Sequence, residues 1–134
     1  MKRKQTVPGR PIFLHGRRVN LRPLDAATDL PSCVRWMNEE VVREFISTFV
    51  PTTSASEAEW FANLTKRDHD VVLGIETVSG RFIGVIGLHH IDWKDRHAET
   101  GTVIGERDAW GNGYGTEAKL LLLKYAFEEL GLHK

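Results

Sequence analysis

A short alternation of apolar and polar residues opens the regular part of the chain. From Arg18 to Pro23 every second side chain is apolar, which predicts a β-strand with one buried face, ended by the proline. Apolar residues next recur at helical spacing, and Thr28 or Asp29 is suited to cap this helix. The stripe expected to face the core consists of Leu30, Val34, Met37 and Val41.

A second helix and three strands follow. The helix is expected to begin at Ser54 or Ser56, with acidic residues in its first turn. Its expected buried stripe consists of Ala58, Phe61, Ala62 and Leu64. Three runs rich in β-branched and apolar residues, 71–78, 82–91 and 98–104, are separated by polar turns. They predict an antiparallel meander.

Glycine residues mark the second half of the chain. Gly84 and Gly87 fall inside the second of the three strands, which indicates close approach of another group there. A glycine-rich loop joins the third strand to a strongly apolar helix, expected from about Tyr114 to Leu130 and ended by Gly131. Strands in a run, with helices before and after them, predict an α+β fold with a mostly antiparallel sheet rather than a doubly wound parallel one.

Length and charge fit one small domain. The chain has 134 residues, 41% of them hydrophobic and 27% charged, and its 18 basic and 18 acidic side chains cancel. Nothing in the total charge indicates a nucleic-acid or membrane partner. Basic residues are concentrated near the start, and we interpret residues 1–10 as a flexible basic arm and 11–134 as the domain. The arm lacks the interleaved aromatic residues that nucleic-acid binding favours.

The cysteine content and the hydropathy exclude several classes. The single cysteine, Cys33, allows neither an internal disulfide nor a cysteine metal site, and no metal is expected. Its surroundings indicate a small core residue. No apolar run approaches the ~20 residues that span a bilayer, and no signal-peptide core follows the basic start. The sequence therefore favours a reducing, cytoplasmic compartment.

The most informative segment is the glycine loop before the last helix. It consists of Trp110, Gly111, Asn112, Gly113, Tyr114, Gly115 and Thr116. Alternating glycines let a backbone approach a ligand closely, and the following helix offers free N–H groups, so the loop suits a phosphate. Thr116 and Glu117 stand where a P-loop needs Lys and then Ser or Thr. The loop's spacing and late position also do not fit a dinucleotide fingerprint.

The stretch from Glu99 to Lys134 resembles the acetyl-CoA-binding motif of the GNAT N-acetyltransferases. It most resembles the branch that includes the ribosomal-protein N-terminal alanine acetyltransferases, and the segments RVNLRPLDAATDL, RWMNEEVVREF and SASEAEWFANL resemble that branch's first strand and first two helices. Gly113 and Gly115 match the superfamily signature, whereas Trp110 stands where Arg or Gln is usual; an aromatic residue is common there in this branch. The resemblance implies the GNAT fold and transfer of an acetyl group from acetyl-CoA to a primary amine.

The resemblance also implies roles for individual residues. The CoA pyrophosphate would lie on residues 110–116 and the helix that follows, and the pantetheine arm would pair with the backbone of Val103 and Ile104. The amine must lose a proton before it attacks the thioester, and the best candidate for the general base is Glu99. A partly buried carboxyl at this position would have a raised pKa. The implied donor to the oxyanion is the N–H of Val103.

Several assignments stay open at this point. Glu99 is equally compatible with a solvated residue paired to Arg96 or His97. His89 and His90 must face opposite sides of the sheet, so one of them lines the acceptor site or both are structural. In the resembling branch the first two helices form the acceptor pocket, here with Trp36, Asn38, Glu39, Phe45, Phe49 and Trp60. N-terminal amines, aminoglycosides, polyamines and small amino acids all fit.

The chain ends at Lys134, where proteins of the resembling branch continue through another strand, a helix and a hairpin. We therefore expect a domain whose C-terminal strands are missing, or one completed by another chain or by exchange in a homodimer. The last helix would then lack its usual partner along Leu120, Leu123, Phe127 and Leu130. The alternative function is an acyl-CoA-binding module or inactive fragment without turnover.

Overall fold

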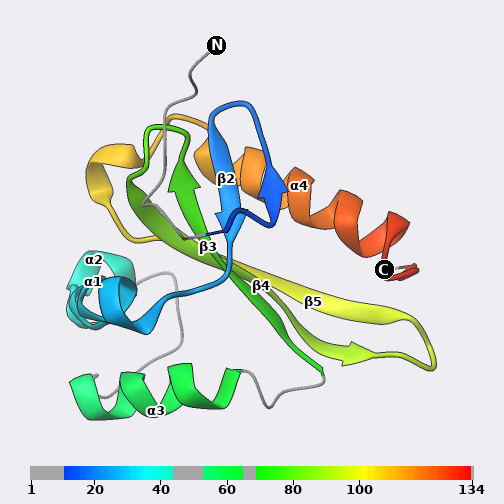
Figure 1. Cartoon of the computed structure of the whole chain (residues 1–134), viewed down its shortest axis with the longest axis horizontal. Helices are drawn as coiled ribbons and strands as arrows, with labels where there is room; N and C mark the ends of the chain where they lie inside the picture. The colour runs from blue at the N-terminus through cyan, green and yellow to red at the C-terminus, as the bar shows by residue number, and fades with distance from the viewer. Residues whose placement is uncertain (1–10, 44–52, 65–68, 134) are drawn as a thin grey trace.

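The centre of the molecule is a five-stranded antiparallel sheet with the strands in the order β1 to β5 (Figure 1). The computed structural model describes residues 11–43, 53–64 and 69–133, so the predicted arm 1–10 and the candidate acceptor residues Phe45 and Phe49 lie outside the described part. The strands are β1 (Leu14–His15), β2 (Val19–Arg22), β3 (Val71–Thr77), β4 (Phe82–Asp92) and β5 (His97–Ile104). The predicted α+β meander is confirmed; β1, with two residues, is too short for a sequence pattern.

Helices cover both faces of this sheet. They are α1 (Ala26–Asn38), α2 (Glu40–Arg43), α3 (Ser54–Leu64) and α4 (Tyr114–Glu128), and a 3₁₀ turn at Arg107–Ala109 precedes the glycine loop. The α4 helix lies on one side of the sheet and α1 to α3 lie on the other (Figure 1). Among the described helices, none has the length and apolar character that crossing a bilayer requires.

The two faces of the sheet are buried by different chemistry. On the α4 side, Val19 and Leu21 of β2 and Ile75 of β3 are fully buried and belong to one apolar cluster with Ala118 and Leu122 of α4. On the α1 side, the fully buried Arg22 of β2 pairs with Asp29 of α1 at 2.8 Å and with Glu76 of β3 at 2.6 Å. The buried ion pairs fix α1 against the sheet.

The α1 helix begins earlier and faces the core with a different stripe than the sequence pattern predicts. Asp25 is the cap, and its side chain accepts a hydrogen bond from the N–H of Ala27. The buried residues of α1 are Asp29, Cys33 and Trp36, whereas the predicted Leu30, Val34 and Met37 are only half-buried and the side chain of Val41 is not described. The predicted cap is wrong, and of the predicted stripe Leu30 packs against the buried cluster of Cys33, Trp36 and Val42 without being fully buried. The Arg22–Asp29 ion pair sets the rotation of the helix, and hydropathy does not register a buried charge.

The α3 helix begins at Ser54 as predicted, but the two described members of its predicted stripe are not buried. Ala58 and Ala62 are exposed, whereas Glu57 and Trp60 are half-buried, and Trp60 packs against the cluster of Cys33, Trp36 and Val42. The side chains of Phe61 and Leu64 lie outside the described part. Burial raises the pKa of the Glu57 carboxyl. An aromatic and an acidic residue, rather than the small apolar ones, therefore turn this helix toward α1.

Candidate active site

Within the described residues, β5 is an edge strand. It pairs with β4 on one side only, from Gly84 opposite Ile104 to Asp92 opposite His97, so its outer side presents backbone N–H and C=O groups that an extended ligand could pair with. The expected close approaches at the two β4 glycines are confirmed. A Cβ added to Gly84 would lie 2.3 Å from the carbonyl oxygen of Val103, and a Cβ added to Gly87 would lie 2.9 Å from the imidazole of His89.

A pocket of about 220 Å³ opens beside the C-terminal end of β5. Its lining residues are Val42, Thr102, Val103, Ile104 and Trp110, and the last three were assigned from the sequence to the cofactor. The indole N–H of Trp110 donates to the carbonyl of Ile104 at 2.7 Å. This bond folds the start of the glycine loop back onto the strand, and it occupies one lone pair of a carbonyl that was expected to pair with the pantetheine arm.

The chain leaves β5 through a tightly packed turn at Gly105. A Cβ at this position would lie 1.9 Å from the Trp36 ring, so no side chain fits. The Trp36 indole N–H donates to Glu106 at 2.9 Å, and Arg35 and Arg81 pair with the same carboxylate. Trp36 is fully buried and supports the strand end, so its expected place in an acceptor pocket is wrong.

The glycine loop has the backbone shape of an anion cradle. Gly111 and Gly113 have left-handed φ angles of 81° and 78°, which residues with a Cβ rarely adopt. Gly113 is the N-cap of α4 and offers no side-chain cap, so the first N–H groups of the helix are left for a ligand or water. The Asn112 side chain donates to the Ala109 carbonyl at 3.1 Å and holds the loop from inside.

Arg18 and Glu117 also touch this loop, and sequence reasoning missed both. The Arg18 guanidinium donates to the carbonyl of Asn112 at 2.6 Å and to Glu117 at 3.1 Å. The two residues are 99 positions apart, and a basic residue at the start of a strand gives no local signal of such a contact. The packing of α4 against β2 brings them together.

Glu99 lies toward the opposite end of β5 and is not buried. Its side chain is 75% exposed, with Oε2 at 3.6 Å from Nδ1 of His90, so the structure shows the solvated alternative and not a partly buried carboxyl. The expected partner His97 instead lies 3.7 Å from Asp92. Residues at alternate positions of a strand share a face, so Glu99 lies on the same face as Val103, with Gly101 between them.

His89 lies between Glu99 and the pocket on this same face. Its Nε2 would lie 2.9 Å from a Cβ added to Gly87 and 3.6 Å from one added to Gly101. These two glycines are directly opposite each other on β4 and β5, so the imidazole ring covers both. Its Nδ1 lies 3.9 Å from the carboxylate of Asp70, which also accepts the backbone N–H of His90 at 3.0 Å. The two glycines make room for the imidazole to lean toward the pocket.

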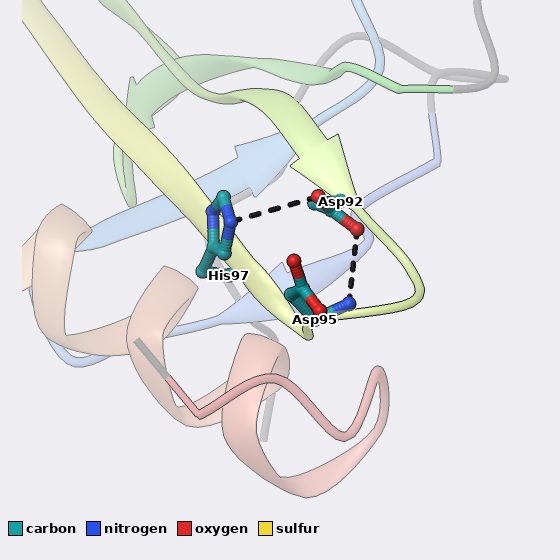
Figure 2. A group of neighbouring side chains, drawn as sticks. All are labelled: Asp92, Asp95 and His97. Carbon is teal, nitrogen blue, oxygen red and sulfur yellow. Dashed lines mark hydrogen bonds and ion pairs between the residues drawn. The ribbon is translucent and has the colours of Figure 1, made fainter.

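Three potential metal ligands, Asp92, Asp95 and His97, gather at the tip of the β4–β5 hairpin (Figure 2). Asp92 Oδ1 accepts the backbone N–H groups of Asp95 at 2.9 Å and Lys94 at 3.0 Å. These hydrogen bonds, that of Asp95 first, lower the pKa of the Asp92 carboxyl. The arrangement is that of an aspartate closing a tight turn, which accounts for the cluster without a metal.

The remaining expected acceptor residues lie around the end of α1. Asn38 is exposed and donates to the Val34 carbonyl at 2.9 Å, whereas Glu39 is half-buried and forms the C-cap. Cys33 is buried, and burial raises the pKa of its thiol to about 12. A thiol with such a pKa is not a nucleophile near neutral pH, so its predicted place in the core is confirmed.

Comparisons with known proteins agree with this geometry. The family model described as "Acetyltransferase (GNAT) domain" matches residues 18–134. An uncharacterized N-acetyltransferase, p20, from Bacillus licheniformis is 29% identical over 131 residues, covering 90% of this chain and 69% of the relative.

Two solved structures share the fold. The spermidine N-acetyltransferase of Vibrio cholerae, in complex with CoA and spermine, has a TM-score of 0.79 at 21% identity, covering 87% of this chain and 68% of that one. A Vibrio cholerae protein assigned as a ribosomal-protein-serine acetyltransferase has a TM-score of 0.70 at 19% identity, covering 96% of this chain and 72% of that one. At these identities the likeness shows the fold alone, and the family model decides membership: the chain belongs to the GNAT acetyltransferase family.

Proposed function

We propose that this acetyltransferase moves the acetyl group of acetyl-CoA to a primary amine, with the pyrophosphate on residues 110–116 and the thioester arm along Val103 and Ile104. The observation that carries the proposal is the joining of the glycine loop to the pocket. The α4 N-terminus, the loop and the exposed edge of β5 are continuous through the Trp110–Ile104 hydrogen bond. A phosphate cradle next to an unpaired strand edge suits a long ligand with a charged end and an amide-bearing arm.

Direct transfer requires few protein groups. The ammonium form of the amine first gives up one proton. Its nitrogen then adds to the thioester carbonyl, forming the C–N bond and an oxyanion, and the oxyanion collapses as the C–S bond breaks, the thiolate leaves with CoA and the nitrogen loses its second proton. A general base is needed for the first proton. We propose Glu99 as the acceptor of that proton and the N–H of Val103 as a donor to the oxyanion. Four residues of extended strand separate Glu99 from Val103, about 13 Å, so the proton would reach this exposed carboxylate through water.

His89 is the competing proton acceptor, and one observation favours it. Its ring covers Gly87 and Gly101, nearer to the pocket than Glu99, and its Nδ1 faces Asp70. An imidazole exchanges protons near neutral pH. The two assignments predict opposite mutational results.

The test measures thiol release from acetyl-CoA in Glu99→Gln, His89→Gln and a control, Glu128→Gln, which removes an exposed charge from α4. With Glu99 as base, kcat/KM falls about 100-fold in Glu99→Gln, while the other two variants stay near wild type. Loss confined to His89→Gln would overturn the role of Glu99 and assign the step to His89.

The acceptor belongs to the class of primary amines. The V. cholerae neighbours are described as acting on spermidine and on a ribosomal protein, and the sequence resembles the ribosomal-protein branch. The amine panel therefore contains spermidine, an aminoglycoside, and peptides with N-terminal alanine or serine. Thiol release with none of these, in a chain that binds CoA, would favour the alternative of a binding module without turnover.

A further inference from the structure

Arg18, the residue before β2, reaches across to the glycine loop and holds two of its carbonyl groups. Its Nη1 donates to the carbonyl of Asn112 at 2.6 Å, and its Nη2 lies 3.5 Å from the carbonyl of Gly113. Its guanidinium carbon lies 5.5 Å from the centre of the Tyr114 ring, within the range of a cation–π contact. One side chain therefore touches three successive residues of the loop.

Peptide geometry converts these contacts into an orientation of the loop N–H groups. In a planar trans peptide the C=O of one residue and the N–H of the next point in opposite directions. Drawing the carbonyl of Asn112 toward Arg18 therefore turns the N–H group of Gly113 away from it. The Gly113 carbonyl also accepts the N–H of Glu117 at 3.0 Å, so α4 itself directs the N–H of Tyr114. These two N–H groups lie at the N-terminus of α4, where the helix dipole favours an anion.

Glu117 holds Arg18 in place. Its Oε1 accepts from Nε of Arg18 at 3.1 Å, and its Oε2 accepts the backbone N–H groups of Arg18 at 2.8 Å and Val19 at 3.1 Å. Burial by itself would raise the pKa of Glu117, but these hydrogen bonds prevail and lower it. The carboxylate is thus charged near the cradle, and the guanidinium offsets a charge that would otherwise repel a phosphate.

We propose that Arg18 is a positioning residue for cofactor binding: it aims the N–H group of Gly113 at the pyrophosphate of CoA, beside the N–H of Tyr114 that α4 directs, and is itself oriented by Glu117. This inference rests on the proposed function of the loop. It assigns Arg18 to the orientation of the cradle and not to direct contact with the phosphate, because three of its nitrogen atoms already face protein oxygens.

The test compares Arg18→Met, Arg18→Lys and a matched control, Arg17→Met, which removes the same charge from the exposed neighbouring position. Calorimetry measures the Kd of CoA. Kinetics measures kcat/KM for acetyl-CoA and for S-acetylpantetheine, which carries the thioester arm but no phosphate. We expect both Arg18 variants to raise the Kd of CoA about 10-fold. Methionine removes the donors, and lysine keeps the charge but lacks the planar guanidinium that contacts several acceptors at once. Arg17→Met and the reaction of S-acetylpantetheine should stay within 2-fold of wild type.

Each other outcome overturns the inference in a distinct way. A wild-type Kd in Arg18→Lys would show that only the charge matters, and an equal loss with S-acetylpantetheine would show a general structural defect. Where Arg18→Met does not fold, Arg18→Lys carries the comparison. If wild type binds CoA and both Arg18 variants bind it equally well, the role of Arg18 is wrong but the proposed function stands. If wild type does not bind CoA, the proposed function fails with it.

Discussion

The two ends of β5 hold their polar groups in different ways. At the C-terminal end, the indole N–H of Trp110 donates to the Ile104 carbonyl at 2.7 Å, and the carboxylate of Glu106 accepts the indole N–H of Trp36 at 2.9 Å. Toward the N-terminal end, the side chains of Glu99 and His90 are 75% and 78% exposed, and Oε2 of Glu99 lies 3.6 Å from Nδ1 of His90. One end is built from short hydrogen bonds and the other from solvated groups.

Under the proposed function, this difference separates cofactor binding from the reaction. A preorganised end loses little conformational freedom when a ligand arrives, which suits a cofactor common to the whole family. An open, solvated end can admit an amine from water and pass its proton to solvent, which suits the acceptor side of the reaction. We therefore expect substitutions at the closed end to change stability and cofactor affinity, and substitutions at the open end to change turnover.

Gly105→Ala gives the largest expected effect on stability. A Cβ at Gly105 would overlap the fully buried ring of Trp36, so we expect the free energy of unfolding to fall by about 3 kcal/mol, measured by urea denaturation. The control is Gly111→Ala, where the added Cβ meets open space at a φ of +81° and should cost about 1 kcal/mol. Equal losses at the two glycines would contradict the tight packing assigned to this strand end.

Glu117→Gln gives a smaller and pH-dependent effect. A carboxyl whose pKa is lowered on folding contributes stability that is present above its unfolded pKa, about 4.3, and is lost as pH falls through the folded value. We expect the free energy of unfolding of wild type to exceed that of Glu117→Gln by about 1 kcal/mol at pH 7, and we expect this difference to vanish in acid. Urea unfolding from pH 7 to pH 3 measures it, with Glu128→Gln as control. A difference that persists unchanged at pH 3 would exclude the ionised Glu117 as its source.

Local patterns predicted the elements and the loop well. The strands 71–78, 82–91 and 98–104 and the helix after the glycine loop are visible because their periodicity and turn residues lie within a few positions of one another. The loop residues 110–116 form one continuous segment, so their spacing alone indicated an anion. These features needed no knowledge of which strands are neighbours.

Features that depend on contacts across the sheet could not be predicted. The rotation of α1 follows from the Arg22–Asp29 ion pair, and the orientation of the loop involves Arg18. The exposure of Glu99 depends on how far the β4–β5 hairpin extends beyond the helices, and hydropathy along a strand does not record this. Charged residues that pair at long range look like surface residues in a sequence, so reading their burial requires the fold.

The binding of CoA tests the central claim most directly. Calorimetric titration of the wild-type chain with CoA is expected to show one saturable site with a Kd below roughly 100 μM, and pantetheine, which lacks the pyrophosphate, is expected to bind more weakly. A folded chain that shows no saturable binding at millimolar CoA, or that binds pantetheine and CoA equally, would contradict the assignment of the glycine loop as the pyrophosphate site.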